Sequence, residues 1–313
     1  MECIAGTSEF YIDEPTVVTI GKFDGRHKGH QKLLHKMLEL KQELGYKTAV
    51  FTFDTAPLNL VGGTSRTVIT TNEERRNNMD KMGIDYLVEY PFTEAASRMP
   101  PEEFIRQILV GNMHARAVVA GTDCGFGYRR AGDADLLRSL SETYGYQAFI
   151  IDKEQDRSRD ISSTYVKEEL DRGNMEKVNE LLGEPYSIHG IVVHGNHIGG
   201  PRLGFPTANI VPPAHKHLPP FGVYVSKVSV NGILHGGVTN IGRKPTVGGE
   251  SPVGVETFIF DLEQDIYGSW IEVQLFHYSR PEQKFASLDD LKAQISKDKD
   301  FARMYLDKMS SGT

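Results

Sequence analysis

The stretch that decides the fold of this chain is Thr19-Ile20-Gly21-Lys22-Phe23-Asp24-Gly25-Arg26-His27-Lys28-Gly29-His30. The β-branched run from Thr16 to Ile20 leads into it and predicts a buried strand. Beyond it, apolar residues recur with the period of a helix, at Leu33, Leu34, Met37, Leu38 and Leu44. A glycine-punctuated turn therefore joins a strand to an amphipathic helix, and the two histidines are predicted in the first turn, on one helix face.

A helix start of this kind can bind a nucleotide polyphosphate. Its unpaired N–H groups and its partial positive charge favour anions. Gly25 and Gly29 are expected to leave room for a ligand to approach the backbone. The chain contains no G-x-x-x-x-G-K-[ST] sequence, so the phosphates would be held without a Walker loop. A solvated histidine pair is the alternative interpretation, but the order strand, turn and helix favours a site.

The segment resembles the H-x-G-H nucleotidyltransferases, a Rossmann-like superfamily that moves a nucleotidyl group from ATP to an acceptor. The resemblance implies that His27 and His30 are catalytic, contact the phosphates and stabilise charge in the transition state. It implies no covalent enzyme intermediate. It also implies ATP binding by the turn residues Gly21, Phe23, Asp24 and Gly25.

Composition limits the remaining possibilities. A length of 313 residues predicts about two domains, and 39% hydrophobic with 25% charged residues is ordinary for a globular protein. The net charge of −7 argues against a broad nucleic-acid footprint. Cys3 and Cys124 form neither a metal-like spacing nor a disulfide framework. No membrane-spanning run or signal peptide is seen, so we expect a cytoplasmic protein without membrane or nucleic-acid partners.

The two halves of the chain differ in pattern. The first half alternates strand-like runs (49–53, 86–88, 117–120 and 148–151) with helix-like runs (73–82, 101–109 and 133–140). This alternation predicts a parallel sheet with crossover helices and ligands at the carboxyl ends of the strands.

Near Pro185 the pattern changes. A helix over 175–182, capped by Gly183, is followed by short strands at 190–193, 222–230, 236–241, 255–260 and 271–276. Helices at 288–295 and 301–309 close the chain. We therefore expect domains at 1–185 and 186–313, the second a small barrel or sandwich.

A second constellation lies in the β-rich half. It comprises Leu203-Gly204-Phe205-Pro206-Thr207-Ala208-Asn209, with V-V-H-G at 192–195, G-V-T-N-I-G at 237–242 and V-E-T-F at 255–258. An ordinary turn is the default interpretation of the first segment alone. Together, however, these segments resemble riboflavin kinase. With the first half, the whole chain resembles the bacterial bifunctional riboflavin kinase and FAD synthetase family, which implies a Rossmann-like domain followed by a Greek-key β-barrel.

The resemblance assigns roles in the kinase half. Thr207 and Asn209 face the same way in an extended segment, and Mg²⁺ prefers oxygen ligands, so the pair is expected to hold Mg-ATP. Glu256 is implied as the general base; a solvated strand carboxylate is the alternative. His194 and Gly195 are implied in a loop over the phosphates. Arg280 and Asn240 are implied near the flavin, with an Arg280–Glu282 ion pair as the alternative for the arginine.

The adenylyltransferase half carries further motifs. In I-S-S-T-Y-V-K (161–167), Ser163 and Thr164 are implied as phosphate ligands, although Ser163 could be only a helix cap. Asp123, in G-T-D-C-G-F-G, is implied at the ATP site. The chain departs from the family at Ala56, Cys124 and Asp160. Asp160 is expected to place negative charge near the phosphate path, where the family has a basic residue.

The function expected from the sequence is phosphorylation of riboflavin to FMN and adenylylation of FMN to FAD. The implied cofactor is Mg²⁺, and ATP, riboflavin, FMN and FAD are the substrates and products. The alternative is a monofunctional riboflavin kinase with a weak or inactive adenylyltransferase domain. A flavin-binding regulator without turnover is disfavoured by the intact set of Thr207, Asn209 and Glu256. The oligomeric state is left open.

Overall fold

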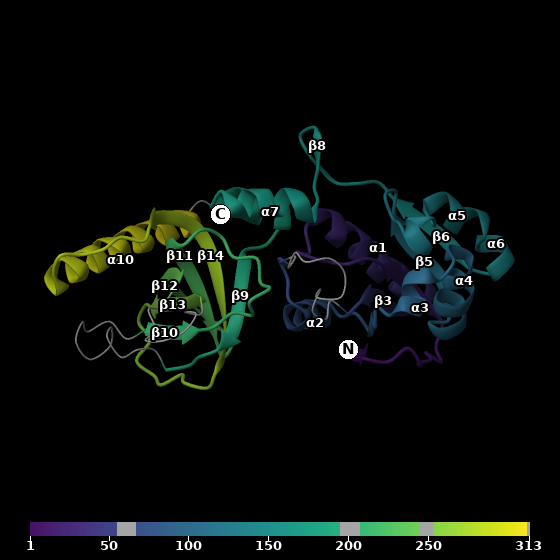
Figure 1. The fold of residues 1–313 in the computed structure, drawn as a ribbon, viewed down its shortest axis with the longest axis horizontal. Helices are drawn as coiled ribbons and strands as arrows, with labels where there is room; N and C mark the ends of the chain where they lie inside the picture. Colours follow the sequence, from purple (N-terminus) through teal and green to yellow (C-terminus); the bar gives the residue numbers. More distant parts are fainter. Residues whose placement is uncertain (55–66, 195–206, 244–252, 312–313) are drawn as a thin grey trace. The chain divides into compact units, whose positions relative to one another are not determined.

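The computed structural model describes residues 1–54, 67–194, 207–243 and 253–311 (Figure 1). Packing divides the chain into two compact units, Met1–Ser163 and Thr164–Thr313. This division falls ahead of the expected boundary at residue 185, which stays a prediction about independent folding.

The first unit is built on a six-stranded parallel sheet. Its strands are β1 (Glu2–Ala5), β2 (Thr16–Ile20), β3 (Lys47–Phe53), β4 (Tyr86–Tyr90), β5 (Ala115–Gly121) and β6 (Gln147–Ile151), in the order β1-β4-β3-β2-β5-β6. Each hydrogen-bonded pair is parallel, as predicted. From β2 the chain proceeds to β3 on one side and later to β5 on the other. Strand order therefore reverses between β2 and β5, which is where open α/β sheets bind ligands.

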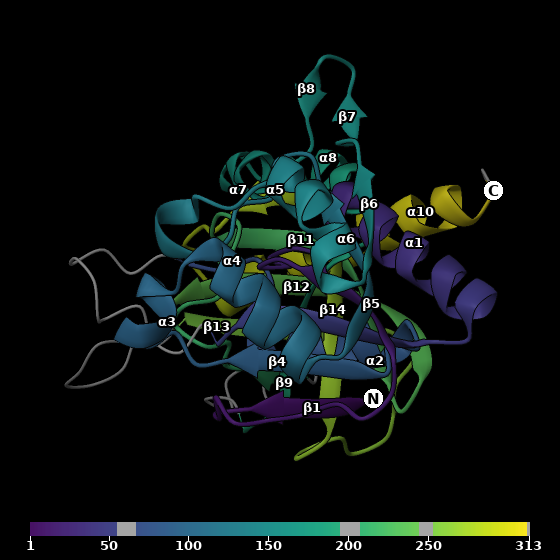
Figure 2. The ribbon, with the colours of Figure 1, turned by 90° about the vertical axis from the view of Figure 1, so that its right-hand side faces the viewer.

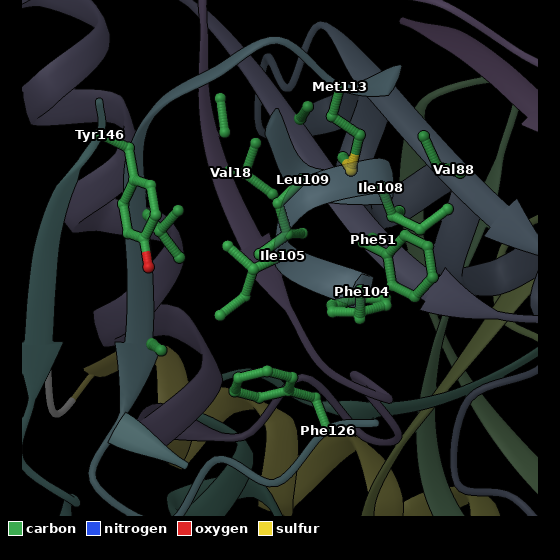
Figure 3. Packing of buried hydrophobic residues seen from close by; sticks show 14 of the residues in the cluster. Val18, Phe51, Val88, Phe104, Ile105, Ile108, Leu109, Met113, Phe126 and Tyr146 are labelled. Carbon is green, nitrogen blue, oxygen red and sulfur yellow. The ribbon is translucent and has the colours of Figure 1, made fainter. Parts of the chain in front are cut away.

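Helices cover both faces of this sheet. They are α1 (Lys28–Leu44), α2 (Asn72–Lys81), α3 (Glu94–Arg98), α4 (Pro101–Glu103), the π-helix η1 (Phe104–Asn112), the short 3₁₀ segment η2 (Tyr128–Arg130), α5 (Ala134–Ser139) and α6 (Ser141–Tyr144). On one face, Leu34 and Met37 of α1 and Met79 of α2 pack against the strands. On the other, η1 supplies Phe104, Ile105, Ile108 and Leu109 to the cluster in Figure 3. The helix expected over 101–109 is thus α4 continued by η1.

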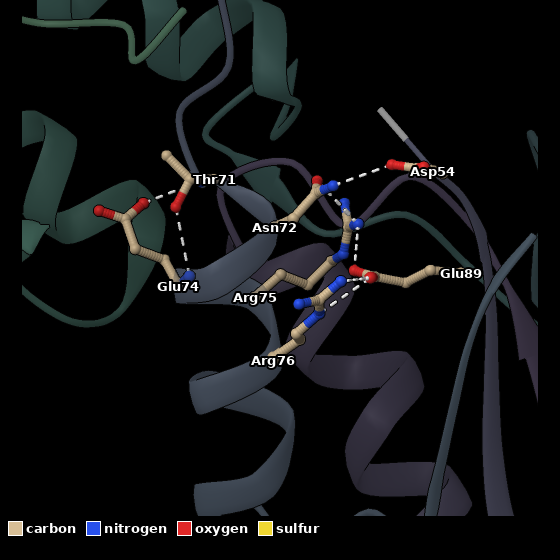
Figure 4. Close-up of polar contacts among 7 residues, drawn as sticks. All are labelled: Asp54, Thr71, Asn72, Glu74, Arg75, Arg76 and Glu89. Atoms are coloured by element: carbon tan, nitrogen blue, oxygen red, sulfur yellow. Dashed lines mark hydrogen bonds and ion pairs between the residues drawn. The ribbon is translucent and has the colours of Figure 1, made fainter. Parts of the chain in front are cut away.

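An ion-pair cluster fixes α2 to the sheet (Figure 4). Thr71 and Glu74 form a reciprocal capping box at the start of α2. One turn on, Arg75 donates to Oε1 of Glu89 at 2.7 Å, while Nε of Arg76 donates to Oε2 at 2.9 Å. Glu89, in β4, is fully buried and Arg75 is only 2% exposed. The buried charge of Glu89 is therefore matched by the buried guanidinium of Arg75 and by that of Arg76, whose side chain is 45% exposed.

The second unit begins with two helices, α7 (Ser163–Asp171), whose first residue ends the first unit, and α8 (Met175–Leu182). Gly183 caps α8 with a left-handed backbone (φ 71°), as predicted. The side chains of Met175, Val178, Leu181 and Leu182 are buried. Helix α8 packs against the barrel, and Asn179 donates to the carbonyl oxygen of Leu275 at 2.9 Å.

The sheet of the second unit is antiparallel. Its strands are β9 (Tyr186–Ile191), β10 (Thr207–Ile210), β11 (Gly222–Val230), β12 (Ile233–Arg243), β13 (Val253–Ile259) and β14 (Trp270–Pro281), in the order β10-β13-β12-β11-β14-β9. An isolated bridge between Val193 and Asn209 joins the two edges. The meander β11-β12-β13 with β14 returning beside β11 is a Greek key, as predicted. The strand expected at 190–193 instead ends at Ile191.

A single long helix, α10 (Leu288–Ser311), ends the described chain. The prediction of two separate helices, over 288–295 and 301–309, is therefore wrong. Between them lies Asp298, which accepts hydrogen bonds from Arg280 of β14 and from Gln294 one turn earlier. These contacts hold the polar middle of the helix in helical form. Ala302 and Leu306 then pack against Val225 and Phe260 of the barrel unit.

Candidate functional site

The turn after β2 is held by its own aspartate. Oδ1 of Asp24 accepts from the backbone N–H groups of Ile69 and Thr70, at 2.7 and 3.1 Å. Gly25 has φ 72°, and a Cβ there would lie 2.7 Å from Cδ1 of Ile69. The space at Gly25 is therefore filled by the protein's own packing rather than left for a ligand. Phe23 is 1% exposed and belongs to the core. The side chains of Asp24 and Phe23 thus shape the turn, and ATP binding by Gly21 to Gly25 stays a prediction.

The two histidines form one stacked pair at the start of α1. His27 occupies the cap position just before Lys28, so it lies outside the first turn in which it was expected. The rings of His27 and His30 are 3.8 Å apart at their centroids, with planes 21° from parallel. His27 is 7% exposed, and neither its Nδ1 nor that of His30 has a hydrogen-bond partner. Two buried ring nitrogens therefore lack a hydrogen-bond partner at this helix start.

Burial keeps this pair uncharged. Removal from water lowers the pKa of His27 to about 4, although the carboxylates of Asp24 and Asp123 act in the opposite direction. Burial and the neighbouring His27 lower the pKa of His30 well below its ordinary value of 6.5. Both imidazoles are therefore neutral at pH 7, and each can donate or accept one hydrogen bond per ring nitrogen according to its tautomer.

Ser163 and Asp123 complete this edge of the first unit. Oγ of Ser163 donates to the carbonyl oxygen of Asp24 at 2.6 Å, so Ser163 braces the turn. Asp123 follows β5, the strand beside β2 at the switch point, and its charge acts on His27. Thr164 is the next residue along α7 and is counted with the second unit. Binding of ATP by Asp123, Ser163 and Thr164 stays a prediction.

The structure describes two of the three residues at which the chain departs from the family, Asp160 and Cys124. Asp160 is paired: Oδ2 lies 2.9 Å from Nζ of Lys153, and Oδ1 accepts from Gln155 at 2.9 Å. The hydrogen bond from Lys153 lowers the pKa of Asp160. The negative charge expected at Asp160 is therefore partly offset by Lys153, which Asp160 shares with Asp123. Cys124 packs against the core cluster, and burial raises the pKa of its thiol to about 11. Ala56 lies outside the described residues.

In the second unit, three neighbouring strands bring the predicted kinase residues into one row. Glu256 of β13 lies directly opposite Asn209 of β10 on one side and Asn240 of β12 on the other. Opposite residues in antiparallel strands project to the same face. Val255 and Thr257 point to the other face and are fully buried. On the Glu256 face, Phe258 packs against the cluster formed with α10.

Thr207 is joined to this row by a hydrogen bond. Its hydroxyl donates to Oε1 of Glu256 at 2.6 Å, and Nδ2 of Asn209 donates to the carbonyl oxygen of Thr207 at 3.2 Å. The structure thus places Thr207, Asn209 and Glu256 together, although Glu256 is 49 residues from Thr207 in the sequence. Glu256 is not a solvated strand carboxylate, because it is partly buried and hydrogen-bonded within a polar cluster.

His194 lies beside this cluster, since the preceding Val193 bridges to Asn209. Its ring lies against that of Tyr267, with centroids 3.9 Å apart and planes tilted by 32°. Gly195 lies outside the described residues. The contribution of His194 to nucleotide binding stays a prediction.

Arg280 has a partner that neither interpretation of the sequence included. Its guanidinium forms a two-pronged hydrogen bond with Asp298 of α10, with Nη2 2.6 Å from Oδ2 and Nε 3.0 Å from Oδ1. The alternative partner, Glu282, instead accepts from Asn240 at 3.3 Å. Arg280 therefore fastens the end of β14 to α10. A flavin contact by Arg280 or Asn240 stays a prediction.

Sequence reasoning missed the partners rather than the motif residues. Lys153, Tyr267 and Asp298 each contact a predicted site residue, and none belongs to a motif. Glu282 was expected only as an alternative partner of Arg280, and its contact with Asn240 was missed. The one sequence signal for Asp298 is its position four residues after Gln294, the spacing at which side chains meet on a helix face.

No helix within the described ranges is long and apolar enough to cross a membrane. Residues 1–54, 67–194, 207–243 and 253–311 also contain no group of three or more His, Cys, Asp or Glu side chains arranged to hold a metal ion.

A histidine pair at the switch point of a doubly wound sheet, followed by a Greek-key unit with a Thr-Asn-Glu cluster, defines a two-unit ATP-dependent transferase. Residues 10–165 match the FAD synthetase family, and residues 182–306 match the riboflavin kinase family. The chain belongs to the bifunctional riboflavin kinase/FMN adenylyltransferase family.

Relatives support this assignment over nearly the whole length. The chain is 33% identical to the bifunctional riboflavin kinase/FMN adenylyltransferase of Listeria monocytogenes, covering 97% of this chain and 96% of that protein. It is 36% identical to the protein of the same name from Escherichia coli, covering 93% of each. A solved structure described as a macrolide-efflux protein from Streptococcus pneumoniae is similar in fold, with TM-score 0.84 and 29% identity over 96% of this chain and 98% of that one.

Proposed function

We propose that the barrel unit phosphorylates riboflavin with Glu256 as general base, and that the first unit adenylylates FMN at His27 and His30. The two activities are those of the family. The observation that carries the residue assignment is the cluster of Thr207, Asn209 and Glu256, joined by the 2.6 Å hydrogen bond from Thr207 to Glu256.

In the kinase reaction, the terminal hydroxyl oxygen of the ribityl chain attacks the γ-phosphorus of ATP and ADP leaves. A carboxylate beside the hydroxyl can take its proton, and Glu256 is the carboxylate of this cluster. The register that sets Asn209 and Asn240 on either side of Glu256 supports this role, because it fixes the position of the carboxylate between two polar neighbours.

The same cluster offers oxygen ligands for Mg²⁺. A hydroxyl that donates its hydrogen to Glu256 keeps its lone pairs for a cation, and Mg²⁺ prefers hydroxyl, amide and phosphate oxygens. Thr207 and Asn209 would hold the ion, which neutralises charge on the ATP phosphates when it is bound.

In the adenylyl transfer, an FMN phosphate oxygen attacks the α-phosphorus of ATP and pyrophosphate leaves. His27 and His30 support this step because their unpartnered ring nitrogens can donate to phosphate oxygens. A bound polyphosphate favours the protonated imidazoles, so the ligand itself would raise the lowered pKa values of the pair.

A reducing, cytoplasmic setting is part of the same proposal and agrees with the free thiols of Cys3 and Cys124.

The test is to incubate the full chain with riboflavin and Mg-ATP and to separate FMN from FAD over time. Formation of FMN followed by FAD is the expected result. FMN without FAD, also when FMN is supplied, would favour the second candidate, a riboflavin kinase with an inactive adenylyltransferase unit. The substitution at Cys124 is the observation that favours this candidate, because its thiol stands in the core beside the predicted Asp123.

A further inference from the structure

Lys153 occupies an unusual position at the carboxyl edge of the first unit's sheet. It follows β6 and precedes the two-stranded hairpin of β7 (Gln155–Asp156) and β8 (Arg159–Asp160), which stands out from the body of the unit in Figure 2. Its Nζ lies 2.9 Å from Oδ2 of Asp160 and 3.4 Å from Oδ2 of Asp123. One ammonium group is thus shared by carboxylates from two separate segments.

Contacts with α1 place this hairpin base beside the histidine pair. Nζ of Lys32, in the second turn of α1, donates to the carbonyl oxygen of Asp152 at 3.2 Å and lies 3.4 Å from Oε2 of Glu154. On the returning segment, the carbonyl oxygen of Ile161 would lie 3.8 Å from a Cβ at Gly29. Lys153 is therefore on the same edge of the sheet as His27 and His30.

The charges at this edge do not suit an anion as they stand. The two histidines are neutral near pH 7, while Asp123 and Asp160 contribute carboxylates. A nucleoside triphosphate brings up to about four further negative charges. A cation facing the phosphates would offset this charge, and Lys153 already lies against Asp123.

The geometry points to Lys153 as a phosphate-binding residue of the adenylyl-transfer site. Asp123 and Asp160 position its ammonium group, which exchanges a carboxylate partner for a phosphate oxygen when ATP binds. The side chain of Lys153 is 36% exposed, and ion pairs at such exposure are worth little, so exchanging a carboxylate for a phosphate oxygen costs little. An ammonium is also a compact charge with three donors and can turn between partners. The inference rests on the proposed position of ATP in the first unit.

This role for Lys153 changes the effect expected of Asp160 on ATP binding. The sequence suggests that Asp160 repels phosphate, whereas the structure makes it the residue that positions a cation. Asp160→Arg would put a second positive side chain beside Lys153 in place of its carboxylate partner, so it should impair FAD formation.

The test uses the full chain and the reverse reaction, in which FAD and inorganic pyrophosphate give FMN and ATP. Lys153→Met should raise the KM for pyrophosphate about 10- to 100-fold, the range for losing a hydrogen bond to a charged group. Lys153→Arg should stay within a few-fold of wild type, because it keeps the charge. The control is Lys36→Met on α1, with 31% exposure and an ion pair to Glu39, which should leave the KM unchanged.

Riboflavin phosphorylation, measured in the same preparations, should be equal in all variants, which shows that the barrel unit is intact. The activity retained by Lys153→Arg shows that the first unit tolerates substitution at this position. An unchanged KM for pyrophosphate in Lys153→Met would overturn the inference while leaving the proposed function intact. Where the wild type forms no FAD, the proposed function of the first unit fails, and calorimetric titration with pyrophosphate still decides. Weaker binding by Lys153→Met supports a phosphate contact, and equal binding overturns it.

Discussion

The hydroxyl of Thr207 donates to Oε1 of Glu256 across 2.6 Å, and this contact links strands β10 and β13 within the cluster of Thr207, Asn209 and Glu256. The hydrogen bond orients the carboxylate and at the same time directs the lone pairs of the hydroxyl away from it. One hydrogen bond therefore orients both Thr207, which is proposed to bind a cation, and Glu256, which is proposed to accept a proton.

Glu256→Gln should abolish most riboflavin phosphorylation. The amide keeps the shape of the side chain and can still accept from Thr207, but it cannot take a proton. The loss of a general base typically costs about 10²–10⁴ in rate. The measurement is kcat for FMN formation, and adenylylation of supplied FMN by the same protein is the internal control. Undiminished phosphorylation would remove Glu256 from this role.

The stability of the first unit should fall as the pH drops from 7 towards 4. His27 has a pKa of about 4 in the folded chain against 6.5 ordinarily. Between these values the unfolded chain binds a proton that the folded chain does not, so the free energy of unfolding decreases with falling pH, by on the order of 3 kcal/mol for this group.

Thermal unfolding at pH 7.5 and 5.0 measures this effect. His27→Gln should show a smaller drop in Tm between the two values than wild type, and His35→Gln, on the exposed side of the same helix, should behave as wild type. Equal pH dependence in all three proteins would contradict the assignment to His27.

Glu89→Gln should destabilise the first unit strongly. The substitution leaves the buried guanidinium of Arg75 without its counter-charge, and breaking a buried pair costs about 3–5 kcal/mol. Denaturant unfolding provides the measurement. The matched control is Glu94→Gln, because Glu94 pairs with Arg98 on the surface, where both side chains are more than two-thirds exposed. That change should be nearly neutral, and comparable losses in both variants would show that the buried cluster contributes nothing special.

A fragment of residues 164–313 should be more stable than one of residues 186–313, although both are expected to phosphorylate riboflavin. The shorter fragment lacks α8, whose four apolar side chains are buried, and whose Asn179 bonds to Leu275 and to the N–H of Tyr186. Burial of each such side chain is worth about 1.5–3 kcal/mol, so the difference should amount to several kcal/mol. Circular dichroism melts of both fragments measure it. Equal melting temperatures would mean that the kinase unit begins at residue 186, as the sequence suggests.

The sequence by itself determined the features that depend on local chemistry. The β-branched run at Thr16 to Ile20 predicted β2 to the residue, and Gly183 predicted the end of α8. Both follow from backbone preferences and from the period of apolar residues, which neighbouring residues alone can set. The family motifs likewise identified Thr207, Asn209 and Glu256 as one set.

Only the tertiary structure decided which charged groups meet and which histidines lose their charge. Arg280 pairs with Asp298, Asp160 with Lys153, and α10 runs unbroken because Asp298 is held at its middle. The same holds for the neutral pair of His27 and His30, whose state depends on burial by the surrounding fold. The physical reason is that desolvation and ion pairing depend on distances between segments remote in sequence, and no local pattern records those distances.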